Sequence, residues 1–423
     1  MDLNRHPCYQ VEAKGRFGRV HLPIAPKCNI QCNYCNRQYD CVNESRPGVT
    51  STVLSPGQAL RYVEQVLERE PRITVAGIAG PGDPLANAET TMETLSLIRQ
   101  KFPKLILCLA TNGLGLPPYL DRLAELKVSH VTVTINAVDP DVGEKMYAWV
   151  RDGRAVYRGG AAAELLLNRQ IESIYGLKMR GFLVKVNCIV VPGENDHHVA
   201  EVARRMSELG VDIFNCMPVY PSPDTPFADI TEPSEEMMST LRQQAAQYIP
   251  QLYHCTRCRA DAVGLLNEDR TQELRDCLTA CSALPLNPDE DRPYVAVASR
   301  EGTLVNLHLG EAAQFMIFGQ AGKGFSLMET RPGPQPGSGQ ARWQALVHTL
   351  RDCRAVLVSG IGESPKTVLE KAGIRPVEMY GFIEQGLEAV FHNGDLRGLK
   401  ARRISCTRAA GCSKSGSGAG CCG

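Results

Sequence analysis

The chain has little of what nucleic-acid-binding, membrane and secreted proteins need. Aromatic residues make up only 6% of its 423 residues, which leaves few rings to stack on bases. Lysine plus arginine equals aspartate plus glutamate, at 46 each, so bulk charge does not favour a nucleic-acid or membrane-surface partner. No apolar run reaches the roughly 20 residues of a membrane span, and the first ten residues contain no apolar signal core. We therefore expect a soluble, cytoplasmic protein with no nucleic-acid or membrane partner.

Cysteine, by contrast, is abundant, with 17 residues. Disulfides are not expected in a reducing compartment, so clustered cysteines are better interpreted as metal ligands. The clusters are Cys28, Cys32, Cys35 and Cys41, then Cys255 and Cys258, and in the tail Cys406, Cys412, Cys421 and Cys422. Three further cysteines, Cys108, Cys188 and Cys353, lie in apolar runs, and we expect them to be small buried core residues.

Short apolar runs recur through the first 220 residues, at 19–25, 73–79, 105–110, 130–135, 182–190 and 211–217. Helical patterns, such as those of residues 55–70 and 196–210, lie between most of them. This alternation predicts parallel βαβ units. The expected fold class is α/β, a partial (βα)6 barrel whose active site lies at the carboxyl ends of its strands. A doubly wound open sheet is the alternative, and periodicity alone does not separate the two.

The length predicts more than one domain. We expect the barrel and its C-terminal extension over residues 1–281, and a linker rich in proline and aspartate over 282–293. A second, smaller α/β domain is expected over 294–400, with strand patterns at 294–299, 315–318 and 355–360 and a helical pattern at 364–373. Residues 401–423 are rich in glycine and serine and are expected to form a flexible tail.

The stretch CNIQCNYC at residues 28–35 spaces three cysteines as C-x3-C-x2-C, directly after the first expected strand. Iron–sulfur clusters usually take four cysteine ligands, so three leave one iron open to an exogenous ligand. A zinc site is the alternative, but zinc prefers a closed set of four ligands. The spacing resembles the signature of the radical S-adenosylmethionine (SAM) superfamily. That resemblance implies a 4Fe–4S cluster whose open iron binds SAM and whose electron cleaves it to a 5′-deoxyadenosyl radical.

The same resemblance implies where SAM would be contacted, because further matches follow the later strands at the same end of the barrel. Tyr34 would lie beside the cofactor, and the glycine-rich turn after the second strand would meet the methionine amine. The implied SAM-binding residues are Tyr34, Gly80, Gly82, Asp83, Asn112, Thr134, Asn136, Ile189 and Met217.

One cluster leaves five candidate ligands unexplained: His6, Cys8, Cys41, Cys255 and Cys258. All could converge on the mouth of the barrel, since thiolate and imidazole both ligate iron. They are too few to close two more cubane clusters. Such under-ligation suits clusters that must react or leave.

Several stretches together resemble one family within the superfamily. These are HPC at 6–8, the three-cysteine motif, CVNESRPGV at 41–49, GIAGPGDPLAN at 77–87 and CTRCRADAVGLL at 255–266. They are similar to the NifB family of nitrogenase iron–molybdenum cofactor biosynthesis proteins along nearly the whole chain. Residues 306–318, NLHLGEAAQFMIF, resemble the NifX-like carrier domain fused to many members, which implies a ribonuclease H-like second domain.

The family resemblance implies a reaction. Two 4Fe–4S clusters, bound as substrates by the five remaining ligands, would be fused into an 8Fe–9S–C cluster, the precursor of the iron–molybdenum cofactor. One SAM would donate a methyl group to a cluster sulfide, a second would yield the radical that strips it to carbide, and an extra sulfur would be added. Cluster donor proteins, a ferredoxin-like electron donor, and cofactor carrier and scaffold proteins are the implied partners.

Glu44, Ser45 and Arg46 follow Cys41 closely and could relay protons as the methyl group is stripped. The alternative is an ion pair between Glu44 and Arg46 within a loop, which contributes little if exposed.

Two other functions compete with this one. Another radical SAM maturase with auxiliary clusters would give HPC no role and would carry more than one C-x2-C after the barrel. A non-catalytic iron–sulfur carrier would need neither the glycine-rich turn nor the open three-cysteine site. Deoxyadenosine formation on reduction with SAM separates enzyme from carrier, and a methyl carbon in the released cluster separates the two enzymes.

Overall fold

The computed structural model describes residues 2–43, 45, 48–49, 51–284, 292–321, 324–334, 339–392 and 399. It divides into two compact units, residues 1–291 and 292–423. Glu44 and Arg46, residues 285–291 of the expected linker and the whole expected tail, 401–423, lie outside the described residues.

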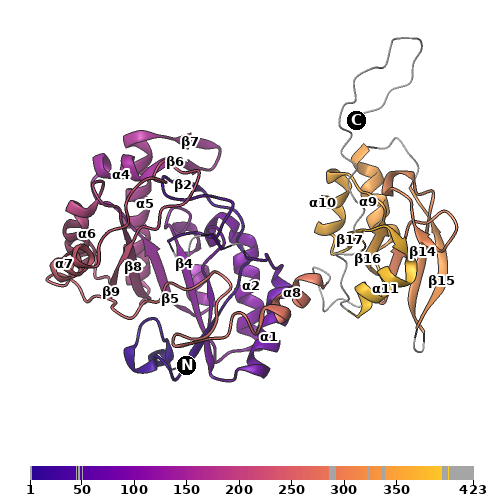
Figure 1. Ribbon diagram of the computed structural model, residues 1–423, viewed down its shortest axis with the longest axis horizontal. Helices are drawn as coiled ribbons and strands as arrows, with labels where there is room; N and C mark the ends of the chain where they lie inside the picture. Colours follow the sequence, from indigo (N-terminus) through magenta and orange to yellow (C-terminus); the bar gives the residue numbers. More distant parts are fainter. Residues whose placement is uncertain are drawn as a thin grey trace, which may run out of the picture. The chain divides into compact units, whose positions relative to one another are not determined.

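The central sheet of the first unit has the strand order β11-β10-β1-β3-β4-β5-β8-β9 (Figure 1). Its parallel strands are β1 (Gly18–His21), β3 (Ile73–Ile78), β4 (Ile106–Thr111), β5 (Val128–Thr134), β8 (Leu183–Val190) and β9 (Ile213–Pro218). β10 (Val263–Leu265) and β11 (Glu268–Asp269) add an antiparallel hairpin at the β1 edge. The parallel strands follow one another in chain order without a reversal, so right-handed crossovers put the connecting helices on one face. The expected partial (βα)6 barrel is confirmed, and the doubly wound sheet is not found.

The helices of this unit are α1 (Pro56–Arg69), α2 (Ala88–Lys101), α3 (Leu120–Glu125), α4 (Pro140–Met146), α5 (Gly159–Met179), α6 (Val199–Glu208), α7 (Glu235–Ala245) and α8 (Arg275–Ala283). The start of α1 shows why the sequence folds there. Ser55 and Gln58 form a capping box, each side chain accepting from the other's backbone N–H, and Pro56 occupies the first helical position. None of the helices in the described part of the chain is long and apolar enough to cross a membrane.

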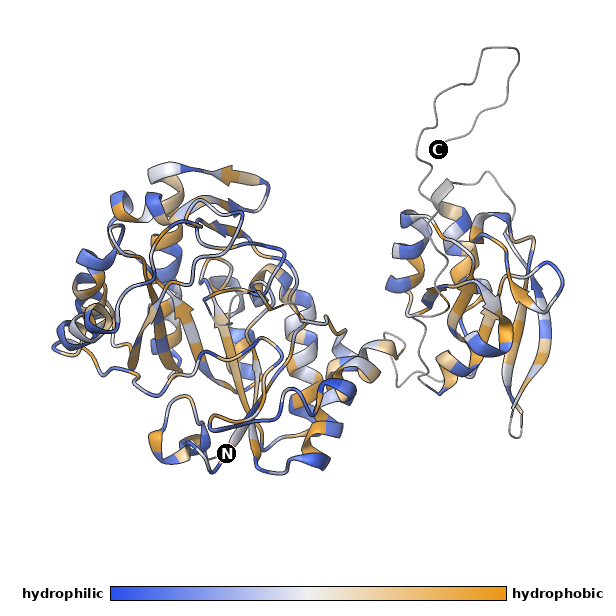
Figure 2. Cartoon of the chain, viewed as in Figure 1, coloured by the Kyte–Doolittle hydropathy of each residue, from blue (hydrophilic) through white to orange (hydrophobic). Residues whose placement is uncertain are grey.

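The strands of the first unit are apolar along most of their length because the sheet is covered on both faces. Every residue of β8 after Leu183 is buried. Figure 2 shows the hydrophobic residues concentrated on the strands inside each unit, with hydrophilic residues on the outer helices. The core between sheet and helices includes Leu107 and Leu109 of β4, whose side chains are fully buried. The alternate strand residues, which face the interior of the barrel, are not part of this contact between sheet and helices.

The second unit has its own sheet, in the order β15-β14-β12-β16-β17. Its strands are β12 (Tyr294–Val297), β14 (Gln314–Ala321), β15 (Gly324–Pro332), β16 (Cys353–Val358) and β17 (Arg375–Glu378), and β13 (Leu304–Val305) pairs separately with β18 (Gly381–Phe382). Its helices are α9 (Gly339–Thr349), α10 (Glu363–Lys371) and α11 (Ile383–Phe391). Alternate residues of β12 enter two different cores: Ala296 packs with the α9 and α10 side, and Val295 with α11. The expected small α/β domain with a separate sheet is confirmed.

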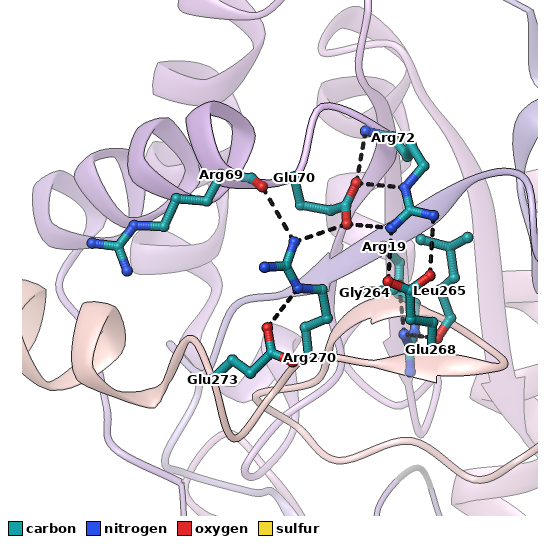
Figure 3. A network of polar contacts seen from close by, with 9 residues as sticks. All are labelled: Arg19, Arg69, Glu70, Arg72, Gly264, Leu265, Glu268, Arg270 and Glu273. Atoms are coloured by element: carbon teal, nitrogen blue, oxygen red, sulfur yellow. Dashed lines mark hydrogen bonds and ion pairs between the residues drawn. The ribbon is translucent and has the colours of Figure 1, made fainter.

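A network of ion pairs fastens the β10–β11 hairpin to the rest of the barrel (Figure 3). The carboxylate of Glu70, at the end of α1, accepts from Arg72 at 2.7 Å and from Arg270 at 3.0 Å. Arg72 also donates to Glu268 of β11 at 2.9 Å. The side chain of Glu70 is only 3% exposed. The hydrogen bonds from Arg72 are the main cause that lowers the pKa of Glu70 to about 2, from an ordinary 4.5.

We expect Glu70→Gln to lower the free energy of unfolding at pH 7 by about 1–3 kcal/mol, the usual range for hydrogen bonds to a charged group. Because the folded-state pKa of Glu70 is depressed, its contribution is complete above pH 4.5 and is lost as the pH falls toward 2. The difference between wild type and variant in urea unfolding should therefore shrink below pH 4.5. Glu273→Gln is the matched control, because Glu273 also pairs with Arg270 but is 64% exposed. A difference that does not change with pH would contradict this assignment.

Candidate functional site

The loop that carries the three-cysteine motif is held by a hairpin inserted between α4 and α5. Within the loop, β2 (Ile30–Cys32) pairs antiparallel with β6 (Tyr147–Asp152), which pairs in turn with β7 (Ala155–Tyr157). Beyond the strands, the Asn33 N–H donates to the Met146 carbonyl at 2.9 Å and the Arg151 N–H to the Asn29 carbonyl at 2.8 Å. The hairpin therefore fixes the backbone on which the cysteines stand. It was not expected from the sequence, since its strands are short and interrupt the strand–helix alternation.

The candidate ligands line two adjoining cavities. The first, called the loop cavity, is lined by Cys28, Cys32, Cys35 and Cys41 together with Gly82, Asp83, Asn112 and Thr134. The second, called the barrel cavity, is lined by His6, Cys8, Cys108, Cys255 and Cys258 and by inward-facing residues of β3, β8 and β9. Ala79 and Ala110 line both cavities, so the two share a wall.

The turn after β3 is locked against the loop after β1 by backbone hydrogen bonds. The Ala25 N–H donates to the Gly80 carbonyl at 3.2 Å, and the Asp83 N–H to the Lys27 carbonyl at 2.8 Å. A side chain on Gly82 would place its Cβ 2.3 Å from the Lys27 oxygen, closer than any real contact. The Cys41 N–H donates to the Pro81 carbonyl at 2.7 Å, which brings the second cysteine loop to the same turn. Glycine is required here because two backbones touch.

Asp83 organises the end of β4. Its carboxylate accepts from the Leu85 N–H at 2.9 Å, from the Thr111 hydroxyl at 2.9 Å and from the Asn112 N–H at 2.7 Å. Burial raises the pKa of Asp83, although these hydrogen bonds act in the opposite direction. Asn112 is thereby turned toward the cysteine loop, where its side-chain amide donates to Asn29 at 2.7 Å.

The other implied SAM-binding residues divide into two groups. Tyr34, Gly80, Asn136 and Ile189 are not among the residues lining these two cavities, and Met217 lines the barrel cavity. Tyr34 is fully buried, and its hydroxyl donates to the Asn43 side chain at 2.8 Å and accepts from Asn136 at 2.6 Å. Asn136 in turn accepts from the Ile189 N–H at 2.9 Å. This chain of hydrogen bonds joins the cysteine loop, the Cys41 loop and the ends of β5 and β8.

In the barrel cavity, the segment of Cys255 and Cys258 is anchored by the arginine between them. Arg257 donates to the Pro218 carbonyl at 2.7 Å and to the Val42 carbonyl, and its guanidinium lies 4.4 Å from the ring centre of Tyr220. It thus ties this segment to the end of β9 and to the loop of Cys41.

His6 is 2% exposed and lies against His130, with ring centres 4.3 Å apart. Its Nδ1 accepts from the Cys8 N–H at 3.2 Å, and its Nε2 has no hydrogen-bond partner in the described residues. Burial, with the nearby charges of His130 and Lys185, lowers the pKa of His6 well below its ordinary value, so the imidazole is neutral. A neutral ring can ligate a metal without first losing a proton from a cation.

The expectation that Cys108 is a core residue is wrong, whereas Cys188 and Cys353 are buried as expected. Successive strand residues point to opposite faces, so Leu107 and Leu109 face the helices while Cys108 and Ala110 face the barrel interior. The sequence did indicate the inward orientation, because Cys108 and Ala110 are two residues apart in the strand and so share a face. The apolar residues on either side of Cys108 led to the wrong assignment.

Burial disfavours the thiolate form of five candidate ligand cysteines. Burial raises the pKa of Cys28 to about 11 and raises those of Cys8, Cys32, Cys35 and Cys41 above the ordinary thiol value. Metal binding must therefore displace protons. Within the described residues, no three His, Cys, Asp or Glu side chains form a ready site for a single metal ion. A cubane cluster takes each thiolate on a different iron, so its ligands stand apart, and the loop cavity, which is lined by several cysteines, fits such a group.

Comparisons with known proteins agree with this geometry. Residues 22–206 match the radical SAM superfamily, and residues 292–393 match the dinitrogenase iron-molybdenum cofactor family. The chain is 49% identical over 425 residues to the FeMo cofactor biosynthesis protein NifB of Chlorobaculum tepidum, covering 100% of this chain and 99% of that protein. The chain belongs to the NifB family. The protein of the same name from Klebsiella pneumoniae is 42% identical over 404 residues, covering 88% of this chain and 86% of that protein.

The solved structures that resemble this NifB family chain are more distant in sequence. The FeFe-hydrogenase maturase HydG from Carboxydothermus hydrogenoformans has a TM-score of 0.41 and 16% identity, covering 56% of this chain and 54% of that one. Methylornithine synthase (PylB) has a TM-score of 0.37 and 15% identity, covering 60% of this chain and 75% of that one. Membership of the radical SAM superfamily implies a 4Fe–4S cluster and SAM, for which the loop cavity has the fitting residues.

We expect Gly82→Ala to separate the turn after β3 from the cysteine loop, because the added methyl group meets the Lys27 carbonyl carbon and oxygen. The cost of such overpacking is about 1–3 kcal/mol, and iron retention by the loop cavity should fall with it. Iron and sulfide content and the melting temperature of anaerobic protein measure both effects. Gly160→Ala is the control, since its nearest neighbour would be Glu144 Oε2 at 3.8 Å. Unchanged iron content in Gly82→Ala would show that the close approach is not required.

Proposed function

We propose that this chain is a radical SAM enzyme of FeMo cofactor biosynthesis that fuses two 4Fe–4S substrate clusters into an 8Fe–9S–C cluster, using a SAM-derived carbon and an extra sulfur. The observation that carries the proposal is the pair of adjoining cavities with separate ligand sets. The names of its relatives support the pathway, since NifB of Chlorobaculum tepidum and that of Klebsiella pneumoniae are both FeMo cofactor biosynthesis proteins.

In the loop cavity, Cys28, Cys32 and Cys35 would hold the 4Fe–4S cluster that, when bound, supplies the electron for SAM cleavage. Gly82 and the Asp83–Asn112 contact shape the wall beside these cysteines, and Thr134 offers a hydroxyl at the end of β5. These groups suit the polar methionine and ribose parts of SAM, because each presents a backbone or side-chain dipole at a buried surface.

In the barrel cavity, His6, Cys8, Cys108, Cys255 and Cys258 would bind the substrate clusters. Cys41 lines the loop cavity instead, with its backbone bonded to the Pro81 carbonyl. We assign Cys41 to the substrate cluster nearer SAM, since it lines the cavity in which SAM is proposed to bind. Six protein ligands cannot close two cubane clusters, which leaves irons available for fusion.

Ser45 supports a proton relay beside Cys41. Its side chain is fully buried, its Oγ has no hydrogen-bond partner within the described residues, and its N–H donates to the Cys41 carbonyl at 2.8 Å. A buried hydroxyl without a partner is costly unless a ligand or a transferred proton completes it. With Glu44 as the base and Arg46 as its counter-charge, Ser45 would carry protons away as the methyl group is stripped.

The second unit is proposed to receive or hold the product cluster, because residues 292–393 match the dinitrogenase iron-molybdenum cofactor family. Cluster donors, a ferredoxin-like electron donor, and cofactor carrier and scaffold proteins remain the proposed partners.

The division between the cavities predicts two separable losses. Cys32→Ala should abolish deoxyadenosine formation from SAM, because it removes a ligand of the loop cavity. Cys258→Ala should retain deoxyadenosine formation but lose iron and the fused cluster. Anaerobic reduction with SAM, followed by quantitation of deoxyadenosine and iron, measures both. Cys277→Ala is the control, since Cys277 is 2% exposed in α8, away from both cavities. Loss of SAM cleavage in Cys258→Ala, with loop-cavity iron intact, would argue against separate sites.

The relay predicts that Glu44→Gln forms deoxyadenosine but makes the fused cluster at least about 100-fold more slowly, the usual minimum for a lost acid–base group. Glu89→Gln, an exposed residue of α2, is the control. Wild-type rates of cluster formation in Glu44→Gln would remove Glu44 from the mechanism.

A further inference from the structure

Arg19 is a buried cation in the wall of the barrel cavity. It is the second residue of β1 and is 1% exposed. Its Nη1 donates to the carbonyls of Gly264 and Leu265 at 2.6 and 3.1 Å, contacts drawn in Figure 3. Its Nη2 donates to the Cys258 sulfur at 3.1 Å. Arg19 therefore bridges the β10 strand and one of the candidate cluster ligands.

A guanidinium this deeply buried ordinarily has a carboxylate partner, because an uncompensated buried charge is costly. Arg19 forms no salt bridge with any residue that the structure describes, and its Nε has no hydrogen-bond partner there. Asp269 of β11 acts on it by charge alone, after the thiols of Cys258 and Cys8. An anion bound by these cysteines in the cavity would supply a counter-charge in direct contact with Arg19.

The rest of the wall of the barrel cavity also carries basic rather than acidic side chains. Lys185, 7% exposed, and Arg257, also 7% exposed, line it with Arg19, whereas no aspartate or glutamate is among its lining residues. Basic side chains around thiols in a low-dielectric space favour an anionic occupant. An iron–sulfur cluster bound by thiolates carries net negative charge, and its sulfides accept hydrogen bonds.

A comparison with Arg72 separates the two possible effects of Arg19, which are to hold the hairpin and to charge the cavity wall. Arg72 fastens the same hairpin from outside the barrel, through Glu268, and is 43% exposed (Figure 3). Loss of Arg72 weakens the hairpin without changing the charge of the cavity wall. Loss of Arg19 weakens the hairpin and also changes the charge of the cavity wall.

We propose that Arg19 is a positioning residue that holds Cys258 in place and supplies the positive charge by which the barrel cavity retains an anionic, thiolate-bound iron–sulfur cluster. This inference rests on the proposed function, in that the cluster is one of the two substrates. Lysine keeps the positive charge but not the forked geometry of the guanidinium. Arg19→Lys and Arg19→Gln therefore distinguish an effect of the charge from an effect of the hydrogen bonds alone.

The test uses full-length protein reconstituted anaerobically with iron and sulfide, in the wild type and in Arg19→Gln, Arg19→Lys and Arg72→Gln. Iron per chain, the electron paramagnetic resonance spectrum of the reduced protein and deoxyadenosine formation are measured. We expect Arg19→Gln to lose about four irons per chain, the content of one cubane cluster, together with the corresponding signal. It should still form deoxyadenosine, Arg19→Lys should recover most of the iron, and Arg72→Gln should match wild type.

Full iron and a wild-type spectrum in Arg19→Gln would overturn the inference. So would an Arg19→Lys variant that loses as much iron as Arg19→Gln, because the fork alone would then explain the loss. If Arg19→Gln does not fold, as judged by its melting temperature, Arg19→Lys decides, with near-complete iron supporting the inference and loss of one cluster opposing it. If the Cys258→Ala variant instead binds as much iron as the wild type, the proposed function is refuted, whatever Arg19 does.

Discussion

The site depends on the close contact at Gly82 between the backbone of the turn after β3 and the backbone of the loop after β1. Its Cβ position is filled by the Lys27 carbonyl, so the turn after β3 can lie directly on the loop after β1. From this contact the rest follows: Cys41 bonds to the same turn through the Pro81 carbonyl, and Asp83 reaches across to hold Asn112. A parallel barrel brings strand ends together, but only this close approach places two cysteine loops and a polar strand end around one cavity.

The second organising feature is a division by ligand chemistry. The loop cavity joins four thiols to groups suited to a polar cofactor, whereas the barrel cavity joins thiols, a neutral imidazole and buried cations with no carboxylate among its lining residues. Arg257 connects the two cavities, because it lines the barrel cavity and donates to the Val42 carbonyl in the loop of Cys41. Arg19 reaches Cys258 within the barrel cavity. Under the proposed function, this charge and this number of ligands suit anionic clusters that are held incompletely, as substrates must be.

Much of this could be read from the sequence, and the reasons for the exceptions are physical. The parallel strands could be predicted from their apolar runs because their sheet is covered on both faces. The cysteine motif could be predicted because the C-x3-C-x2-C spacing is itself specific for this kind of cluster site. The β6–β7 hairpin, residues 147–157, was missed because two short strands carry too little periodic signal. Cys108 was misassigned because an inward-facing strand residue has apolar neighbours on the opposite face. Arg19 gave no signal at all, since nothing local in β1 shows that its partner stands 239 positions later.

In the proposed function, the two cavities cooperate to move a carbon from SAM into a fused cluster. The most direct measurement is the fate of that carbon: anaerobic protein loaded with iron and sulfide is reduced with SAM carrying a ¹³C-labelled methyl group, and the released cluster is examined by ¹³C-resolved electron–nuclear double resonance. The account predicts a ¹³C nucleus coupled to the iron of the released cluster, and its absence after Cys258→Ala. Deoxyadenosine formation without labelled carbon in any released cluster would contradict it.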